Sequence, residues 1–200
     1  MEIKYIGIVG LGTTGRAIAA RTDCYGVNVT VYDSCASKIA AAVETGARPA
    51  RIPADAAELA DAVVVTMPDE SAAEEVLFDL GGVGETLRAG GYVLDASTTG
   101  HAFSCDATAR LAKFGIHRLE LAFDPRAARR RTGRARVLVG GSPDDVAAMD
   151  SLLHLLADDV VHVGPVGSVA ALRQSSAGVP ATRSAVMQAM SAVGPVPALT

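Results

Sequence analysis

Three glycines near the N-terminus have the spacing of a nucleotide-binding turn. Gly10, Gly12 and Gly15 form a G-x-G-x-x-G pattern in "GIVGLGTTG", between an apolar run and a helix-forming stretch. The first glycine permits the tight turn, the second lets the backbone approach a pyrophosphate, and the third lets helix and strand pack closely. The helix N-terminus would offer N–H groups to the phosphates. The residues expected to bind a dinucleotide here are Gly10, Leu11, Gly12, Thr13, Thr14 and Gly15.

An acidic residue supports this interpretation. Asp33 ends the next apolar run, where its carboxylate can accept hydrogen bonds from an adenosine ribose. A carboxylate there repels a 2′-phosphate, so we expect NAD in preference to NADP. The alternative is that the glycine turn only packs a structural βαβ unit and that Asp33 caps a loop.

Short apolar runs and Ala-rich stretches alternate along the chain, which predicts an α/β fold. We expect a Rossmann-like, doubly wound, mostly parallel sheet with a C-terminal helix. The expected strands are 3–10, 27–33, 61–68, 91–97, 116–123, 134–141 and the run "DVVHV". The expected helices lie near 14–24, 36–45, 55–60, 70–78 and 102–114, in "SPDDVAAMDSLLHLL", and from about 167 to 193. The expected domains are a dinucleotide-binding domain, 1–165, and a C-terminal helix, 166–200.

Composition excludes several classes of partner. The net charge is −4, and aromatic residues are only 4% with no tryptophan, which argues against nucleic-acid binding. No apolar run reaches the ~18 residues of a membrane span. Cys24, Cys35 and Cys105 are an odd set without C-x-x-C spacing, which disfavours a disulfide framework or a zinc site. We expect a soluble cytoplasmic protein.

Several segments together resemble the N-terminal domain of the β-hydroxyacid dehydrogenases, which include 3-hydroxyisobutyrate and 6-phosphogluconate dehydrogenases, with imine reductases as relatives. These segments are "IGIVGLGTTGRAIAARTDCYGVNVTVYDS", "DAVVVTMPDESAAEEVLF", "GGYVLDASTTG", "VLVGG" and "VVHVGPVGS". The resemblance places Met67 and Pro68 over the adenosine side of the cofactor and Thr98 near the nicotinamide ribose. It places Ser97 on the substrate side. Alternatively, Ser97 and Thr98 cap the helix that starts near His101.

The chain departs from this family where the substrate would bind. Arg173 stands where the family has its catalytic lysine, and an arginine cannot release a proton at neutral pH. Asp124, Pro125 and Arg126 replace a Ser-Gly-Gly that binds the substrate carboxylate, and Ser176 and Ala177 replace an asparagine pair. The resemblance therefore implies an altered catalytic site.

The residues expected to act on a substrate come from the resemblance and from the chemistry of their side chains. The candidate catalytic residues are Arg173, Ser97 and His101, the last being a titratable group after the "DASTTG" turn. Asp124 and Arg126 are the candidate substrate-binding residues, because a guanidinium pairs with an acid group at two points. The alternative is that the arginine-rich run 126–136 is a solvated loop balanced by nearby aspartates.

The length of the chain suggests a partner. Family members continue as a helical domain, which would otherwise cover the last helix. We expect a homodimer through residues 167–193, and the alternative is that this helix folds back on its own domain. The expected function is that of a nicotinamide-dependent oxidoreductase acting on a small anionic substrate. The alternatives are an inactive NAD(P)-binding or regulatory module and a non-redox enzyme on the same fold.

Overall fold

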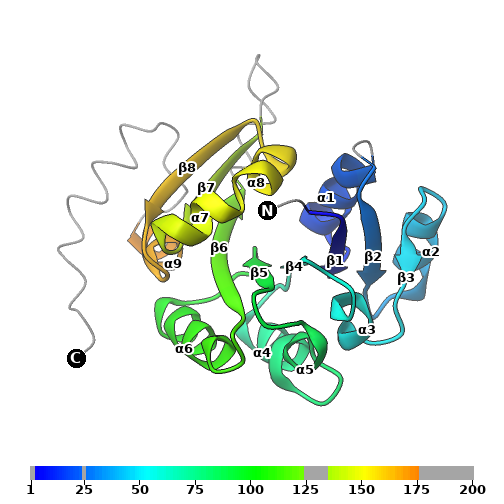
Figure 1. Ribbon diagram of the computed structural model, residues 1–200, viewed down its shortest axis with the longest axis horizontal. Helices are drawn as coiled ribbons and strands as arrows, with labels where there is room; N and C mark the ends of the chain where they lie inside the picture. Colours follow the sequence, from blue (N-terminus) through cyan, green and yellow to red (C-terminus); the bar gives the residue numbers. More distant parts are fainter. Residues whose placement is uncertain (1–2, 24–25, 124–134, 176–200) are drawn as a thin grey trace.

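The strands form one sheet with helices on both faces (Figure 1). The computed structural model describes residues 3–23, 26–123 and 135–175. Within these ranges the sheet has eight strands in the order β3-β2-β1-β4-β5-β6-β7-β8. The strands are β1 (Tyr5–Val9), β2 (Asn28–Tyr32), β3 (Arg48–Pro49), β4 (Ala62–Val65), β5 (Tyr92–Asp95), β6 (His117–Phe123), β7 (Arg136–Gly140) and β8 (Asp159–Gly164).

Neighbouring strands run parallel except for the pair β6 and β7. A parallel pair needs a crossover connection, usually a helix, whereas an antiparallel pair such as β6 and β7 can be formed by strands that are close in the sequence. The mostly parallel, doubly wound sheet expected from the sequence is therefore confirmed, with one antiparallel step. Its central strands are short apolar runs buried on both faces, as the sequence "AVVV" of β4 illustrates.

The helices follow the strands in alternation. They are α1 (Thr13–Asp23), α2 (Ala36–Val43), α3 (Pro53–Ala57), α4 (Glu70–Phe78), α5 (Val83–Thr86), α6 (His101–Ala112), α7 (Pro143–Ala148), α8 (Asp150–Leu156) and α9 (Ser168–Ser175). On one face, side chains of α1, α2 and α8 pack on the sheet in a single apolar cluster. On the other face, α3, α4, α5 and α6 bury a second cluster. This two-sided burial is what positions the loops at the ends of the strands.

Two expected helices differ from the structure. "SPDDVAAMDSLLHLL" forms two helices, because the backbone of Met149 leaves the helical region between α7 and α8. The last helix begins at Ser168, near the expected start, and its expected continuation beyond 175 lies outside the described residues. Leu172 is buried with Val169 against the chain's own β7 and β8. This part of α9 therefore folds back on its own domain.

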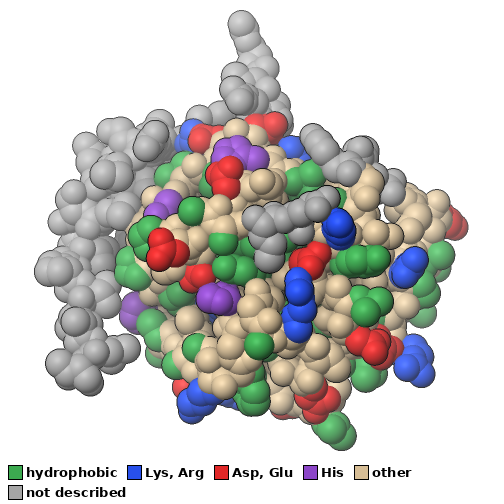
Figure 2. Space-filling view, in the orientation of Figure 1, with side chains coloured by type: hydrophobic (Ala, Val, Ile, Leu, Met, Phe, Trp, Pro, Cys, Tyr) green, Lys and Arg blue, Asp and Glu red, His purple; other side chains and the backbone are tan. Residues whose placement is uncertain are grey.

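The surface carries charges of both signs. On the face shown in Figure 2, Lys and Arg side chains are interspersed with Asp and Glu. In the described part of the arginine-rich run, the Arg136 Nε donates a 2.6 Å hydrogen bond to Asp159, which joins β7 to β8. Across residues 3–175, apart from the gaps named above, no helix is long and apolar enough to cross a membrane.

Candidate cofactor site

A cavity of about 510 Å³ lies where four parallel strands end. Gly10 follows β1, Asp33 follows β2, Thr66 follows β4 and Ala96 follows β5. The chain winds outward in opposite directions from β1 and β4, and such a switch point is where open α/β sheets bind ligands. The lining residues are Gly10, Gly12, Thr13, Thr14, Tyr32, Asp33, Ser34, Lys38, Thr66, Met67, Pro68, Ala72, Glu75, Val76, Ala96 and Thr98.

The structure accounts for the three glycines of the turn in different ways. Gly10 has φ +95°, and a Cβ there would meet the Thr66 carbonyl oxygen at 2.6 Å. A Cβ on Gly15 would lie 1.9 Å from the carbonyl oxygen of Gly10. At Gly12, by contrast, no atom of the described residues lies within 4 Å of such a Cβ. The fold thus requires Gly10 and Gly15, whereas Gly12 leaves open space at the cavity, which is where a pyrophosphate would need the backbone.

Asp33 braces this turn. Its Oδ2 accepts a 2.7 Å hydrogen bond from the Leu11 N–H, and its Oδ1 accepts one of 2.8 Å from the Cys35 N–H. The Lys38 ammonium donates to both oxygens, at 3.1 and 3.2 Å. Burial raises the pKa of the Asp33 carboxyl, but these donors outweigh burial, so the pKa lies below its ordinary value. Asp33 is therefore an ionised group at one end of the cavity.

Lys38 is a cavity residue that the sequence analysis missed. It lies in the first turns of α2, and its side chain is 39% exposed beside the Asp33 carboxylate. The sequence signal for Lys38 was its position five residues after Asp33, in the first turn of the next helix. From there a lysine side chain can reach back to the carboxylate at the end of β2. Its charge offsets that of Asp33 at the rim of the cavity.

The opposite end of the cavity is formed by the segment after β5. Thr98 lines it, and its N–H donates at 3.1 Å to the carbonyl of Met67, the cavity residue that follows β4. The Met67 N–H donates in turn to the Ser97 hydroxyl at 2.9 Å. The cap of α6 is Gly100, with no side-chain hydrogen bond, so the alternative that Ser97 and Thr98 cap this helix is wrong. The two residues instead join the ends of β4 and β5.

Arg173 lies next to this segment. Its guanidinium donates to the carbonyl oxygen of Ser97 at 2.7 Å and to that of Leu121 at 3.0 Å. Burial lowers the pKa of Arg173, while the charges of Glu120 and Asp95 act in the opposite direction. These contacts join α9 to the ends of β5 and β6.

His101 is placed away from the cavity lining, at the start of α6. Its Nδ1 lies 3.1 Å from the Gly167 carbonyl oxygen, and its Nε2 lies 3.7 Å from the Cys105 sulfur. Nδ1 can only donate to a carbonyl oxygen, so Nε2 is left to accept from the thiol. The ring also packs so closely on Gly167 that a Cβ there would lie 2.4 Å from Nδ1.

The structure brings most of the expected cofactor residues together around one cavity. Leu11 and Gly15 support the turn without lining the cavity, since Leu11 is fully buried. Ala96 and Thr98 line the end of the cavity beyond β5 and form what is termed the Thr98 wall. Ser97, His101 and Arg173 do not line the cavity and lie behind or beside this wall. Asp124 and Arg126, expected to bind substrate, lie outside the described residues. The lining combines an open glycine, the first turn of α1 and charged groups at one rim, and this combination fits a dinucleotide.

Comparison with known proteins agrees with this reading of the site. The mitochondrial 3-hydroxyisobutyrate dehydrogenase of Mus musculus is 28% identical over 163 residues, covering 82% of this chain and 49% of that protein. The 3-sulfolactaldehyde reductase of Escherichia coli (strain K12) is 28% identical over 163 residues, covering 81% of this chain and 54% of that protein. The chain spans about half the length of these curated relatives.

A solved structure supports the fold. Mycobacterium tuberculosis 3-hydroxyisobutyrate dehydrogenase superposes with a TM-score of 0.78 at 20% identity, covering 86% of this chain and 58% of that chain. A family model described as the NAD binding domain of 6-phosphogluconate dehydrogenase matches residues 5–164, which include the glycine turn and all the cavity residues. The chain therefore belongs to the family of NAD binding domains of 6-phosphogluconate dehydrogenase, as its resemblance to the β-hydroxyacid dehydrogenases indicated.

Proposed function

We propose that the chain is the cofactor-binding part of a nicotinamide-dependent oxidoreductase that acts on a small anionic substrate. The observation that carries the proposal is the open position at Gly12, which no contact among the described residues explains. A backbone without a side chain at the start of a helix lets a pyrophosphate approach the helix N-terminus. When bound, the nicotinamide would supply or accept the hydride.

The cavity supports NAD in preference to NADP. Asp33 carries a negative charge at the rim, and a 2′-phosphate beside it would be repelled. Lys38 opposes this effect, because its ammonium would attract the same phosphate. Since Lys38 already pairs with Asp33, we propose that the net preference is for NAD and that it is modest.

The relatives support an acidic substrate. Both 3-hydroxyisobutyrate and 3-sulfolactaldehyde, named in the relatives' activities, carry an acid group. Arg126 is the residue of this chain that we propose to bind such a group, and Asp124 is proposed as a second substrate contact, because both stand where the family binds the substrate carboxylate. Arg126 would pair with the acid group at two points.

The proton-transfer step must differ from that of the lysine enzymes. Arg173 keeps the positive charge of the lysine but cannot exchange a proton at neutral pH. Ser97 contacts Arg173 through its carbonyl oxygen, and His101, at the start of α6, is the remaining candidate with an imidazole that can carry a proton. Because Nε2 of His101 faces Cys105, His101 would have to release this contact before it exchanged a proton with a substrate.

One observation favours a second candidate function, an NAD(P)-binding module without turnover. The Arg173 guanidinium donates hydrogen bonds to two backbone carbonyls. These donors are then not directed at a substrate. In this case the cavity would bind the dinucleotide and the chain would serve a regulatory role.

Two further parts of the proposal concern the protein's surroundings. Because α9 packs on its own domain, we propose that the homodimer expected through residues 167–193 is formed by the part of this stretch that follows α9, where the sequence continues with apolar residues. These are Val179, Val186, Met187, Met190 and Val193. We also propose a reducing compartment such as the cytoplasm, because Cys35 is an exposed free thiol.

The experiment is a two-step assay on the purified chain. NADH is titrated first, following its fluorescence, and then NADH consumption is followed with small aldehydes and keto acids that carry a carboxylate or sulfonate. Binding with turnover is the expected result. Binding without turnover would favour the regulatory module, and absence of binding would contradict both functions.

A further inference from the structure

Helix α9 is fixed to the sheet by a buried carboxylate at its start and by a half-buried guanidinium near its other end. The Glu120 carboxylate, on β6, accepts hydrogen bonds from the N–H groups of Gly167 at 2.6 Å and Val169 at 3.3 Å, at the start of the helix. Near its other end, Arg173 donates to the Ser97 and Leu121 carbonyls. Glu120 is only 3% exposed, so these contacts are largely shielded from water. The position of the Arg173 guanidinium is therefore set by the sheet and the helix together.

The segment that Arg173 contacts forms the Thr98 wall of the cavity. Ser97 donates its N–H to the Asp95 carboxylate at 2.8 Å and accepts a hydrogen bond from Met67 on its hydroxyl. Arg173 supplies the partner of the Ser97 carbonyl. With these three contacts, every polar group of Ser97 has a partner. The three hydrogen bonds of Ser97 therefore fix the backbone that leads into Thr98.

An arginine suits this bridging role better than the family's lysine. The planar guanidinium carries five N–H donors in a fixed fork, so it can hold two carbonyls at once. Its contacts span Ser97, after β5, and Leu121, on β6, which lie on adjacent strands of the sheet. Removal of the fork would leave both carbonyls without this donor and free the Thr98 wall to shift.

We propose that Arg173 is a positioning residue that fixes the Thr98 wall of the cavity through the Ser97 carbonyl. This inference rests on the proposed function, in which the Asp33 end of the cavity takes the adenosine half of the dinucleotide and the Thr98 end takes the nicotinamide half. The Asp33 end is built on β2 and α2, and β1 and β4 separate it from β5 in the sheet. Loss of Arg173 therefore weakens binding of the nicotinamide half and leaves the adenosine half unaffected.

The test compares two probes of different length on the full chain. Dissociation constants for NADH and for ADP are measured by calorimetry on the wild-type protein and on Arg173→Met. ADP lacks the nicotinamide ribose and ring, so it reports on the adenosine end and on correct folding. The expected result is a loss of NADH affinity of about tenfold or more. ADP affinity is expected to stay within about twofold of the wild-type value.

A matched control removes a different arginine. Arg110 pairs with Glu74 and lies over the Phe78 ring, away from the cavity lining. Arg110→Met is expected to leave both affinities unchanged. If Arg173→Met does not fold, Arg173→Lys replaces it, because it keeps the charge and loses the fork. For that variant the expected result is an NADH affinity lowered by about threefold or more with ADP affinity unchanged.

Three outcomes would overturn the inference. Equal losses of NADH and ADP affinity would show a general effect on the fold, and unchanged NADH affinity would show that Arg173 does not fix the wall. Either result leaves the proposed function standing. Failure of the wild-type chain to bind either probe would overturn the proposed function, and this inference with it.

Discussion

Asp33 accepts a 2.7 Å hydrogen bond from the N–H of Leu11, so the carboxylate that follows β2 also holds the glycine turn that follows β1. The sequence assigned Asp33 to ribose binding, and the structure adds this second role. A substitution of Asp33 therefore changes the shape of the turn as well as the charge of the rim. Tests of cofactor preference at this position must separate these two effects.

We predict that Asp33→Asn destabilises the fold at neutral pH by about 1–2 kcal/mol, because an amide nitrogen would face one of the two backbone N–H donors. The folded-state pKa of Asp33 is lowered, so its contribution is present above the unfolded pKa of about 3.9. It is lost as the pH falls through the lower, folded-state pKa. Urea unfolding at pH 7 and near pH 3 measures this, and the difference in stability between the two proteins should be smaller near pH 3 than at pH 7.

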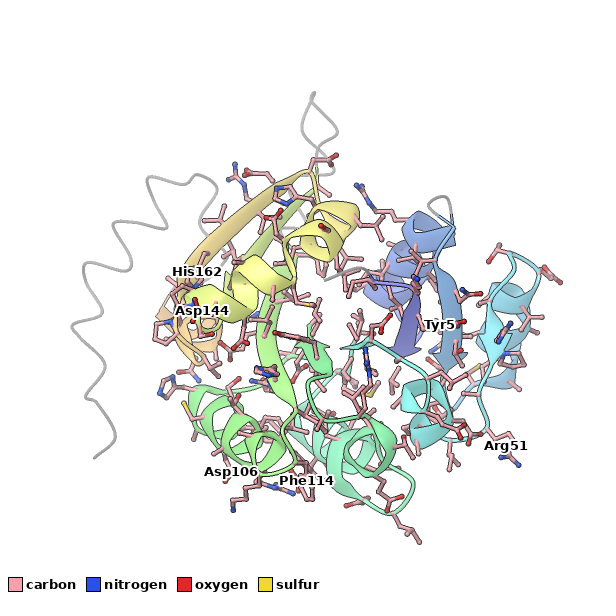
Figure 3. All side chains as sticks on the ribbon, in the orientation of Figure 1. Tyr5, Arg51, Asp106, Phe114, Asp144 and His162 are labelled. Atoms are coloured by element: carbon pink, nitrogen blue, oxygen red, sulfur yellow. The ribbon has the colours of Figure 1, made fainter. Side chains whose placement is uncertain are left out.

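Asp106→Asn is the matched control for this prediction. Asp106 is an exposed carboxylate on α6 that points away from the sheet in Figure 3, and it pairs only with its helix neighbour Arg110 among the contacts that the structure gives it. Exposed pairs of this kind contribute about 0–1 kcal/mol. Equal losses at pH 7 for Asp33→Asn and Asp106→Asn would show that Asp33 does not brace the turn.

We predict that Lys38→Ala widens the preference for NADH over NADPH. The ammonium is the basic group on the cavity lining, and its removal leaves the Asp33 charge unbalanced toward a 2′-phosphate. NADPH affinity should fall by about tenfold and NADH affinity by about threefold or less. Fluorescence titrations with both cofactors measure the ratio. A ratio unchanged from the wild-type protein would place Lys38 away from the 2′ position.

We predict a large loss of stability for Arg118→Met. The Arg118 and Asp95 side chains are each 1% exposed and are joined by a 2.7 Å ion pair, so the substitution leaves a buried carboxylate unpaired. Breaking such a pair costs about 3–5 kcal/mol. Arg110→Met, which breaks a partly exposed pair with Glu74, should cost about 1 kcal/mol or less. Urea unfolding compares the two variants.

A double substitution distinguishes the ion pair from packing alone. Asp95→Asn/Arg118→Met removes both charges of the ion pair, so neither is left buried without the other, and the double variant should be more stable than Arg118→Met. If the double variant lost the sum of both single effects, the ion pair would not be the source of the cost.

Much of the fold and of the cofactor site follows from local sequence patterns. The strands are apolar β-branched runs, and the glycine spacing together with Asp33 locates the switch point between β1 and β4. The elements missed are those too short to show a period, β3 (Arg48–Pro49) and α5 (Val83–Thr86). The break at Met149 was missed because the helical pattern continues through it.

The parts of the site that could not be predicted depend on contacts between distant residues. Arg173 and Ser97 are 76 positions apart, and only the packing of α9 on the sheet brings the guanidinium to the carbonyl. The pairing of Lys38 with Asp33 likewise depends on how α2 turns back toward the end of β2. Side-chain chemistry alone suggested a substrate contact for Arg173, whereas the described geometry gives it two backbone partners.

The most direct test of the central claim is a paired NADH titration of the wild-type chain and Gly12→Val. In the part of the chain that the structure describes, no contact explains the glycine at this position, so Gly12→Val should unfold at nearly the same urea concentration as the wild-type chain. If a dinucleotide lies over the turn, its NADH affinity should fall by more than about tenfold. Equal NADH affinity for the two proteins would contradict the claim that this cavity binds the cofactor.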